Sequence, residues 1–251
     1  MYTRPDCRRR GNAMGMLDRL VGDAKARGVA AIALEATRIG RTLYLKYGFV
    51  QAEAKWSCLR NRTFRRWIIN ITIYLGANPG SDPALKAAVR ELGQWIGECG
   101  HALVYGGSKS GLMGELAQSV LRSGGEVTGV EPRFFVDAGF VYDAITQLIV
   151  TEDMAQRKAK MIELGDAFIA FPGGTGTLEE IAEVMSKVCL GHLDAPCILY
   201  NLNGYYDGLK TQLAHMIRMG LSSQEKQAGI TFADGLAAVM NALKKSDDAL
   251  K

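Results

Sequence analysis

Histidines, prolines and closely spaced cysteines are scarce in this sequence. Its 251 residues include six prolines, three histidines at positions 101, 192 and 215, and five cysteines at positions 7, 58, 99, 189 and 197. The histidines lie too far apart to form a metal-binding pattern, and no two cysteines have the CxxC spacing of a metal or redox site. An odd number of scattered thiols is typical of proteins in a reducing compartment. We therefore expect a cytoplasmic protein without a metal site or a disulfide framework.

Long apolar runs are also missing. No apolar stretch approaches the roughly eighteen residues that a transmembrane helix needs. The first residues, MYTRPDCRRRGN, are basic, but no apolar segment follows them directly, so they do not resemble a secretory signal. Hydrophobic residues nevertheless make up 48% of the chain, which is enough for a sizeable core. The composition favours a globular protein without a membrane partner.

Acidic residues are few in the first quarter of the chain. Residues 1–67 hold 15 lysines and arginines against 5 acidic residues, a net charge of +10, whereas residues 68–251 hold 15 against 21, a net charge of −6. This asymmetry predicts two units with a boundary near residue 67. A basic unit can bind nucleic acid, but a solvated face rich in arginine also explains the charge. We favour the solvated face, and we expect no nucleic-acid partner.

The second unit alternates between short β-rich runs and helical patterns. The predicted strands are 69–76, 101–107, 126–130, 145–150, 166–171 and 196–200. The predicted helices are 83–100, 112–125, 153–164, 178–190 and, approximately, 205–219 and 232–245. Such alternation predicts an α/β fold with a doubly wound, Rossmann-like parallel sheet and helices on both faces. Ligands of such sheets bind at the carboxyl ends of the strands.

Three of the loops that follow predicted strands are rich in glycine. They read GANPGS (76–81), GGSKSGLMG (106–114) and PGGTGT (172–177). Glycine lets a ligand approach the main chain, and the amides at the start of the next helix favour an anion such as phosphate. Tight turns between strand and helix need glycine in any case, so each loop alone is a weak signal. None of the three matches the dinucleotide-binding GxGxxG or the Walker pattern, which argues against a dinucleotide or a nucleoside triphosphate.

Three carboxylates follow the third loop, at Glu179, Glu180 and Glu183. Thr177 and Glu180 have the spacing of a capping box, in which the two side chains satisfy amides at the helix start. That structural role would account for both residues. The alternative is a catalytic carboxylate beside an anion site, and the helical period alone does not decide between Glu179 and Glu180 for that role.

Four segments resemble the LOG family, the cytokinin-activating phosphoribohydrolases. The family signature PGGxGTxxE is matched by PGGTGTLEE (172–180), and its MxxRK segment resembles MAQRKAKM (154–161). YGGSKSGLMG (105–114) and LGANPGSDP (75–83) resemble two further glycine loops of the family. The resemblance covers about residues 68–251 in the right order. The last of these loops departs from the family pattern, because Ala77 and Asn78 stand where small hydroxyl residues are usual.

The resemblance implies an enzyme that cleaves the N-glycosidic bond of nucleoside 5′-monophosphates. Its best-known substrates are N6-prenylated adenosine monophosphates, and the products are the free base and ribose 5-phosphate; AMP itself is a further candidate. Carried onto this chain, the catalytic glutamate is Glu180 and the catalytic arginine is Arg157. A carboxylate at this place would stabilise the positive charge that develops on the ribose, as in glycoside hydrolysis. For Arg157 the alternative is a solvated helix face.

The resemblance also implies which residues bind the substrate. The 5′-phosphate and its surroundings are assigned to Gly173, Gly174, Thr175, Gly176, Thr177, Lys158, Gly107 and Ser108. No metal or cofactor is needed, because backbone dipoles and cations can meet the charge of the phosphate. Members of this length form homodimers, and Met185 and Val188 are candidates for the dimer surface or, equally, for the core.

Two other functions compete with hydrolysis in the second unit. A nucleotide-binding or sensing module would use the same pocket without chemistry. Proteins similar to this unit have also been called lysine decarboxylases, but that reaction normally needs a lysine that carries pyridoxal phosphate. No lysine of this sequence has a suitable context.

The first unit resembles part of a GCN5-related N-acetyltransferase. RRRGNA (8–13) fits the R-x-x-G-x-A loop that binds the pyrophosphate of acetyl-CoA, and LYLKYGF (43–49) resembles a later segment of that family. A helix over 12–27, a strand over 29–36, a helix over 39–48 and a strand over 49–56 are predicted around them. Only residues 8–55 are covered, about half of such a domain. We therefore expect a small α/β fragment, with acetyl transfer as an alternative activity.

Overall fold

The computed structural model describes residues 31–34, 50–52, 55–59 and 68–249. Contacts between Cα atoms divide the chain into two units, Met1–Ile68 and Ile69–Lys251. The described part of the first unit is a three-stranded sheet of β1 (Ala31–Leu34), β2 (Val50–Ala52) and β3 (Lys55–Leu59), in the order β1-β3-β2. Its helices and the RRRGNA segment, as predicted from sequence, lie outside the described residues.

The single strand predicted over 49–56 is wrong. Two strands replace it, and they pair antiparallel with Val50 opposite Ser57 and Ala52 opposite Lys55. β3 also pairs antiparallel with β1, with Ala31 opposite Leu59. A run of alternating residues across two short strands looks continuous in the sequence, because the pattern alone does not reveal a change of chain direction.

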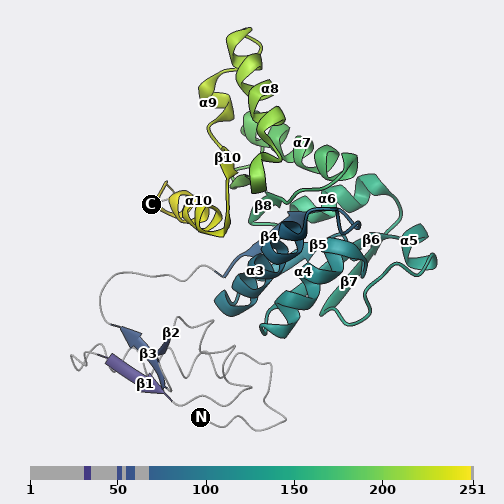
Figure 1. The fold of residues 1–251 in the computed structure, drawn as a ribbon, viewed down its shortest axis with the longest axis vertical. Coiled ribbons are helices and arrows are strands. Elements are labelled where there is room, and N and C mark those ends of the chain that lie inside the picture. The colour runs from purple at the N-terminus through teal and green to yellow at the C-terminus, as the bar shows by residue number, and fades with distance from the viewer. Residues whose placement is uncertain (1–30, 35–49, 53–54, 60–67, 250–251) are drawn as a thin grey trace. The chain divides into compact units, whose positions relative to one another are not determined.

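The second unit contains a seven-stranded sheet in which every neighbouring pair is parallel (Figure 1). In the order β10-β9-β8-β4-β5-β6-β7, its strands are β10 (Ile230–Ala233), β9 (Cys197–Tyr200), β8 (Ala167–Ala170), β4 (Asn70–Tyr74), β5 (Ala102–Tyr105), β6 (Glu126–Pro132) and β7 (Gln147–Thr151). The chain starts in the centre at β4, builds outward to β7, and returns to build β8 to β10 on the other side. The predicted doubly wound α/β sheet is confirmed, and its direction reverses between β4 and β8, where such sheets bind ligands.

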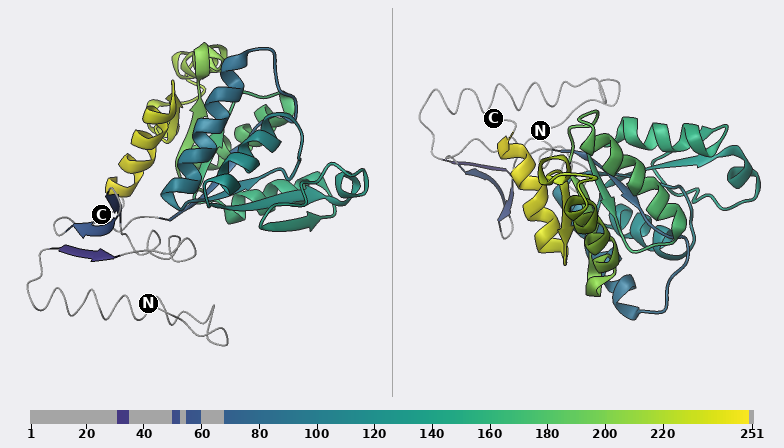
Figure 2. Two further views of the ribbon diagram at one scale, coloured as in Figure 1. Left: turned by 60° about the horizontal axis from the view of Figure 1, so that its bottom comes forward. Right: turned by 90° about the horizontal axis from the view of Figure 1, so that it is seen from above.

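Helices cover both faces of this sheet (Figures 1 and 2). One face carries α3 (Pro83–Cys99), α4 (Gly111–Arg122) and α10 (Leu236–Ala249), and the other carries α6 (Met154–Leu164), α7 (Thr175–Cys189) and α8 (Asp207–Arg218). Alternate residues of β4 point to opposite faces of the sheet. Ile71 and Ile73 pack in the hydrophobic core beneath α3, α4 and α10, and Tyr74 packs in the core beneath α6, α7 and α8. Burial on both faces explains why these strands read as nearly continuous apolar runs.

The ends of α3 show how the sequence sets its helices. Asp82 caps the helix start, since its carboxylate accepts from the amide of Ala84 at 2.8 Å, and Pro83 occupies the first helical position. Gly100 ends the helix in the left-handed conformation, with a φ of 73°. Along its length, Gly93 lets α3 approach α4 closely, because a Cβ there would lie 2.6 Å from the Cβ of Ser119.

Besides the short 3₁₀ helix between β9 and α8, three elements in the described part of the second unit were not predicted. They are α5 (Arg133–Asp137), α9 (Gln224–Gln227) and the edge strand β10. β10 has only four residues, ITFA, and lies directly before a helical pattern, so the predicted helix over 232–245 took in its second half. The helix α10 instead begins at Leu236. Short elements carry too few residues for their periodicity to be recognised.

The described residues bear on two features that the sequence is expected to lack, a membrane-spanning helix and a metal site. Among these residues no helix combines the length and the apolar character needed to cross a lipid bilayer. Within the same part of the chain, no group of three or more histidine, cysteine or acidic side chains is arranged to hold a metal ion.

Candidate active site

The PGGTGT turn leads directly into α7, which begins at Thr175 with Gly174 as its N-cap. Gly174 is extended, and its carbonyl accepts from the amide of Leu178 at 3.1 Å, so the helix starts at Thr175 and not at Leu178, where a cap at Thr177 would place its start. The amides of this first turn have no acceptor within the helix, and together with the helix dipole they favour an anion. The geometry thus suits the predicted phosphate site.

The capping box predicted as an alternative for Thr177 and Glu180 is wrong. Thr177 is the third residue of the helix and is buried, and no side chain caps the helix start. Glu180 binds Arg157 instead. A glycine N-cap explains the difference, because Gly174 adopts the extended conformation that a cap needs without a side chain.

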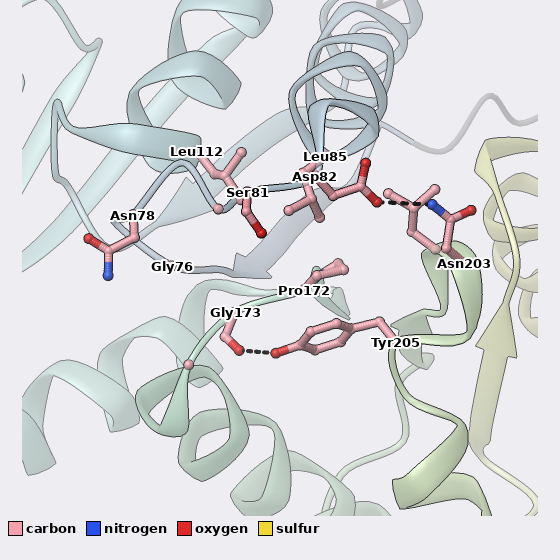
Figure 3. A pocket seen from close by; sticks show the side chains of 13 residues that line it. Gly76, Asn78, Ser81, Asp82, Leu85, Leu112, Pro172, Gly173, Asn203 and Tyr205 are labelled. Atoms are coloured by element: carbon pink, nitrogen blue, oxygen red, sulfur yellow. Dashed lines mark hydrogen bonds between the residues drawn. The ribbon is translucent and has the colours of Figure 1, made fainter.

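A cleft of about 430 Å³ opens beside this turn (Figure 3). The first glycine loop, the start of α3, the PGG turn and the 3₁₀ helix η2 (Leu202–Gly204) enclose it, with lining residues that include Asn78, Ser81, Asp82, Leu85, Pro172 and Tyr205. Tyr205 donates a hydrogen bond to the carbonyl of Gly173 at 2.5 Å, and Asn203 donates to Asp82 at 3.0 Å across the cleft. These two bonds connect the walls of the cleft and fix the turn.

Arg157 and Glu180 form a buried ion pair at the carboxyl edge of the sheet. Nη1 of Arg157 lies 2.5 Å from Oε1 of Glu180, and the two residues are only 5% and 6% exposed. Nε of Arg157 donates to the carbonyl of Val130, at the end of β6, at 2.9 Å. Glu179 is exposed and pairs with Lys158 at 2.6 Å. The structure therefore separates the two glutamates that the helical period left equivalent, since Glu180 alone reaches the buried arginine.

The solvated helix face considered for Arg157 is wrong, because this side chain is buried. α6 starts at Asp153, whose carboxylate accepts from the amide of Gln156 at 2.8 Å, and this places Arg157 one turn into the helix and facing the sheet. Lys158, the next residue, is directed to the surface, where it pairs with Glu179 and with Glu183 at 3.5 Å.

Glu131 is a third charged group in this cluster, and the sequence analysis missed it. It is buried at the end of β6, and its Oε2 lies 3.8 Å from Nε of Arg157. An acidic residue directly after the apolar run VTGV was the available signal, because the end of a buried parallel strand is where ligands bind.

Burial and mutual charge perturb the acidity of these groups. Burial raises the pKa of Glu131 to about 7, against the lowering effect of Arg157. Burial also raises the pKa of Glu180, while the charge and the hydrogen bond of Arg157 act to lower it. Burial, and the nearby charge of Glu180, likewise raise the pKa of the Tyr74 hydroxyl. Perturbed carboxyl groups clustered at a strand edge are typical of functional sites.

The second glycine loop packs against the same cluster. A side chain at Gly106 would collide with Nη2 of Arg157, and one at Gly107 would lie 3.3 Å from Oε2 of Glu131. Gly107 has a φ of 88°, a conformation that favours glycine. Ser108 is buried, and its hydroxyl accepts from the amide of Ser110 at 3.2 Å. Of the predicted residues, Gly107 therefore lies beside Glu131, and Ser108 follows it in the loop.

Met185 and Val188 were candidates for a dimer surface or for the core. Met185 is buried in the hydrophobic cluster between α7 and the sheet, and Val188 packs against the same cluster. Packing within the chain accounts for both residues.

The sequence of this chain is similar to those of known proteins. A family model described as possible lysine decarboxylase matches residues 113–243. The cytokinin riboside 5′-monophosphate phosphoribohydrolase of Rhodococcoides fascians is 38% identical over 176 residues, which cover 70% of this chain and 89% of that protein. The cytokinin riboside 5′-monophosphate phosphoribohydrolase LOG1 of Arabidopsis thaliana is 38% identical over 153 residues, which cover 61% of this chain and 72% of that protein.

Solved structures support the fold. The molybdenum cofactor binding protein of Rippkaea orientalis aligns with a TM-score of 0.55 at 23% identity, over 70% of this chain and 95% of that one. The Moco carrier protein of Chlamydomonas reinhardtii aligns with a TM-score of 0.55 at 20% identity, over 72% of this chain and 98% of that one. At these identities the similarity concerns the fold alone. The sequence matches carry the assignment, and the chain belongs to the LOG family of cytokinin riboside 5′-monophosphate phosphoribohydrolases.

Proposed function

We propose that this protein hydrolyses the N-glycosidic bond of adenosine 5′-monophosphates, including N6-substituted ones, to the free base and ribose 5-phosphate. Family membership supports the reaction, since the relatives at 38% identity are named for it. The observation that carries the proposal is the buried Arg157–Glu180 pair, which lies within two turns of the helix start that follows the PGG turn. An anion site and a buried carboxylate on one helix can hold a sugar phosphate between them.

The carboxylate of Glu180 acts on the sugar. When the C1′–N bond breaks, its electron pair leaves with the base, and the ribose develops positive charge near C1′. A carboxylate in a water-poor site stabilises this charge more strongly than bulk water does. Glu180 also orients the water whose oxygen bonds to C1′. This water loses one proton as the hydroxyl forms, and the departing base, which holds the electron pair of the broken bond, gains one proton, so that neutral base and ribose 5-phosphate result.

Arg157 keeps Glu180 in the charged form that this role needs. Burial alone would favour the neutral acid, and the adjacent guanidinium opposes this effect on the pKa of Glu180. Because the pKa of Glu180 is raised overall, activity falls as the pH decreases through it.

The substrate phosphate binds at the start of α7. The main chain of Gly173, Gly174, Thr175, Gly176 and Thr177 supplies the donors, and Gly107, Ser108 and Lys158 complete the surroundings. For the assembly we propose a homodimer in the cytoplasm, following the family resemblance, and the molar mass in solution tests this part.

Product analysis tests the proposed function. AMP, isopentenyl-AMP and the corresponding unphosphorylated ribosides are incubated with the full chain, and base and ribose 5-phosphate are quantified by chromatography. We expect release from the monophosphates and at least about 100-fold lower kcat/KM for the ribosides, because the ribosides lack the group that the α7 turn binds. Tight nucleotide binding without product, measured by calorimetry, would instead identify a sensing module.

Replacing Gly173 by alanine tests the phosphate turn. A Cβ at Gly173 would lie 2.8 Å from the Cβ of Thr177 and 3.0 Å from the amide nitrogen of Gly76, so the turn must shift. We expect KM for AMP to rise about tenfold or more, because displaced amides lose their contacts with the phosphate. Gly208→Ala on α8 is the control, since nothing lies within 4 Å of a Cβ there. Equal KM values for both variants would place the phosphate elsewhere.

A further inference from the structure

Glu131 has no assigned role in the proposed reaction, although it is one of the most enclosed charged residues of the site. It lies at the end of β6, directly after Val130, whose carbonyl accepts from Nε of Arg157 at 2.9 Å. Its own Oε2 lies 3.8 Å from the same Nε, within the range of an ion pair. The guanidinium is therefore held from two sides, with Glu180 at Nη1 and the end of β6 at Nε.

The surroundings of Glu131 leave its carboxylate few other partners. Oε2 would lie 3.3 Å from a side chain at Gly107, so only a glycine loop allows this approach. The facing ionisable groups are Arg157 on α6, Glu180 on α7 and Tyr105 on β5, and Tyr142 lies beyond Tyr105. The Tyr105 hydroxyl is buried without a hydrogen-bond partner among the described residues. Within the described part of the chain, Arg157 is thus the only cation among the groups that face Glu131.

An arginine that served only to neutralise Glu180 would need one carboxylate, yet here two share one guanidinium. Two buried carboxylates and one guanidinium leave a net negative charge, which is costly in a site of low dielectric constant. Such an arrangement has a benefit if it fixes the orientation of the arginine. A guanidinium bound at both Nε and Nη1 cannot rotate about its long side chain, and Nη2 is then fixed against Gly106.

We propose that Glu131 is a positioning residue of the active site, whose ionised carboxylate holds the Nε edge of Arg157 and so keeps Nη1 on Glu180. This inference rests on the proposed function. It adds that the Arg157–Glu180 pair needs a charged carboxylate at Glu131, which lies farther from the proposed sugar site than Glu180 does.

The charge state of Glu131 gives the inference its pH dependence. Burial raises the pKa of Glu131 to about 7, so the carboxylate gains a proton when the pH falls below neutrality. The protonated acid no longer attracts Nε, and Arg157 can then turn away from Glu180. The wild-type kcat is expected to fall as the pH decreases through about 7.

Glu131→Gln tests this role, because it keeps the shape and removes the charge. Above pH 8 we expect kcat to fall about 10- to 100-fold, since small misplacements of a catalytic group have effects of this size. KM should change less than about threefold, because Glu131 is not proposed to bind the substrate. The decrease in kcat that belongs to Glu131, near pH 7, should disappear, so that the midpoint of the acid-side decrease shifts to lower pH and only the titration of Glu180 remains. Glu163→Gln, an exposed substitution on the helix of Arg157, should leave the profile unchanged.

Glu131→Asp supplies the second variant if the amide disturbs folding. It keeps the charge but shortens the side chain by one methylene, so it should lower kcat and retain a decrease on the acid side. A kcat for Glu131→Gln equal to that of wild type, or a loss that leaves the midpoint of the acid-side decrease unchanged, would overturn the inference.

A measurement without catalysis separates this inference from the proposed reaction. The ¹⁵N resonance of Arg157 Nε reports its environment directly. We expect a slowly exchanging Nε–H signal in wild type at pH 8, and faster exchange in Glu131→Gln. If wild type releases no base at any pH, the proposed function fails, while unchanged Nε–H exchange in Glu131→Gln would overturn the role of Glu131 alone.

Discussion

Replacing Glu180 by glutamine is expected to lower kcat for base release from AMP about 1000-fold or more, the upper range for loss of one group that stabilises a transition-state charge. Glutamine has the same shape and still offers an oxygen to Nη1 of Arg157, so the fold should remain intact. It carries no negative charge, however, and therefore no longer stabilises the ribose cation. Steady-state assays with product quantification measure the loss, and calorimetry should find nucleotide affinity within about threefold of wild type.

Glu179→Gln is the matched control for this experiment. Glu179 precedes Glu180 on the same helix, is 61% exposed at its side chain and pairs with Lys158 on the surface. Exposed pairs contribute little, so kcat should change less than about threefold. Comparable losses in both variants would show that the general charge of the helix start matters and would contradict a specific role for Glu180.

Replacing Arg157 by methionine should damage both stability and activity. Methionine fills a similar volume, but it leaves two buried carboxylates, Glu131 and Glu180, without their cation. Removal of one partner from a buried ion pair costs about 3–5 kcal/mol of unfolding free energy. The kcat should fall by at least about 100-fold, because Glu180 then tends to hold a proton and loses its charge. Urea denaturation and steady-state kinetics measure the two effects.

The stability loss in Arg157→Met should depend on pH in a defined direction. Without the guanidinium, the folded-state pKa values of Glu131 and Glu180 rise further above their unfolded values. A carboxyl group with a raised folded-state pKa contributes stability at low pH, and this contribution is lost as the pH rises through that pKa. The variant should therefore be closer to wild type at pH 5.5 than at pH 8. Lys160→Met replaces a half-exposed lysine of the same helix that pairs with the exposed Glu163, and it should change the unfolding free energy by less than about 1 kcal/mol at both pH values. A deficit that is independent of pH would argue against ionised carboxylates at this site.

The parts of the fold that repeat a strong pattern could be predicted from the sequence. Parallel strands buried on both faces give apolar runs, and the glycine-rich segments such as the one at Gly173 indicate the turns that lead from strand to helix. The short strand β10 and the division between β2 and β3 could not be predicted. Both depend on pairing partners far away in the chain, which a local pattern does not contain.

The candidate site was predictable in its residue types and less so in its pairing. The family resemblance indicated Glu180 and Arg157, but the capping box was an equally good local interpretation until the N-cap proved to be Gly174. The buried contact joins residues 23 positions apart on α6 and α7, and only the order of the strands brings these helices together. Glu131 belongs to no local motif, and its role became visible only through its distance to Arg157.

The crystal structure of Glu180→Gln with isopentenyl-AMP tests the central claim most directly, because the slow variant preserves the uncleaved substrate. The account predicts phosphate oxygens within hydrogen-bond distance of the amides that begin α7. It also predicts the anomeric carbon beside the side chain at position 180, with Arg157 still adjacent. A nucleotide bound with its phosphate away from the PGGTGT turn, or with its ribose directed away from position 180, would contradict the account.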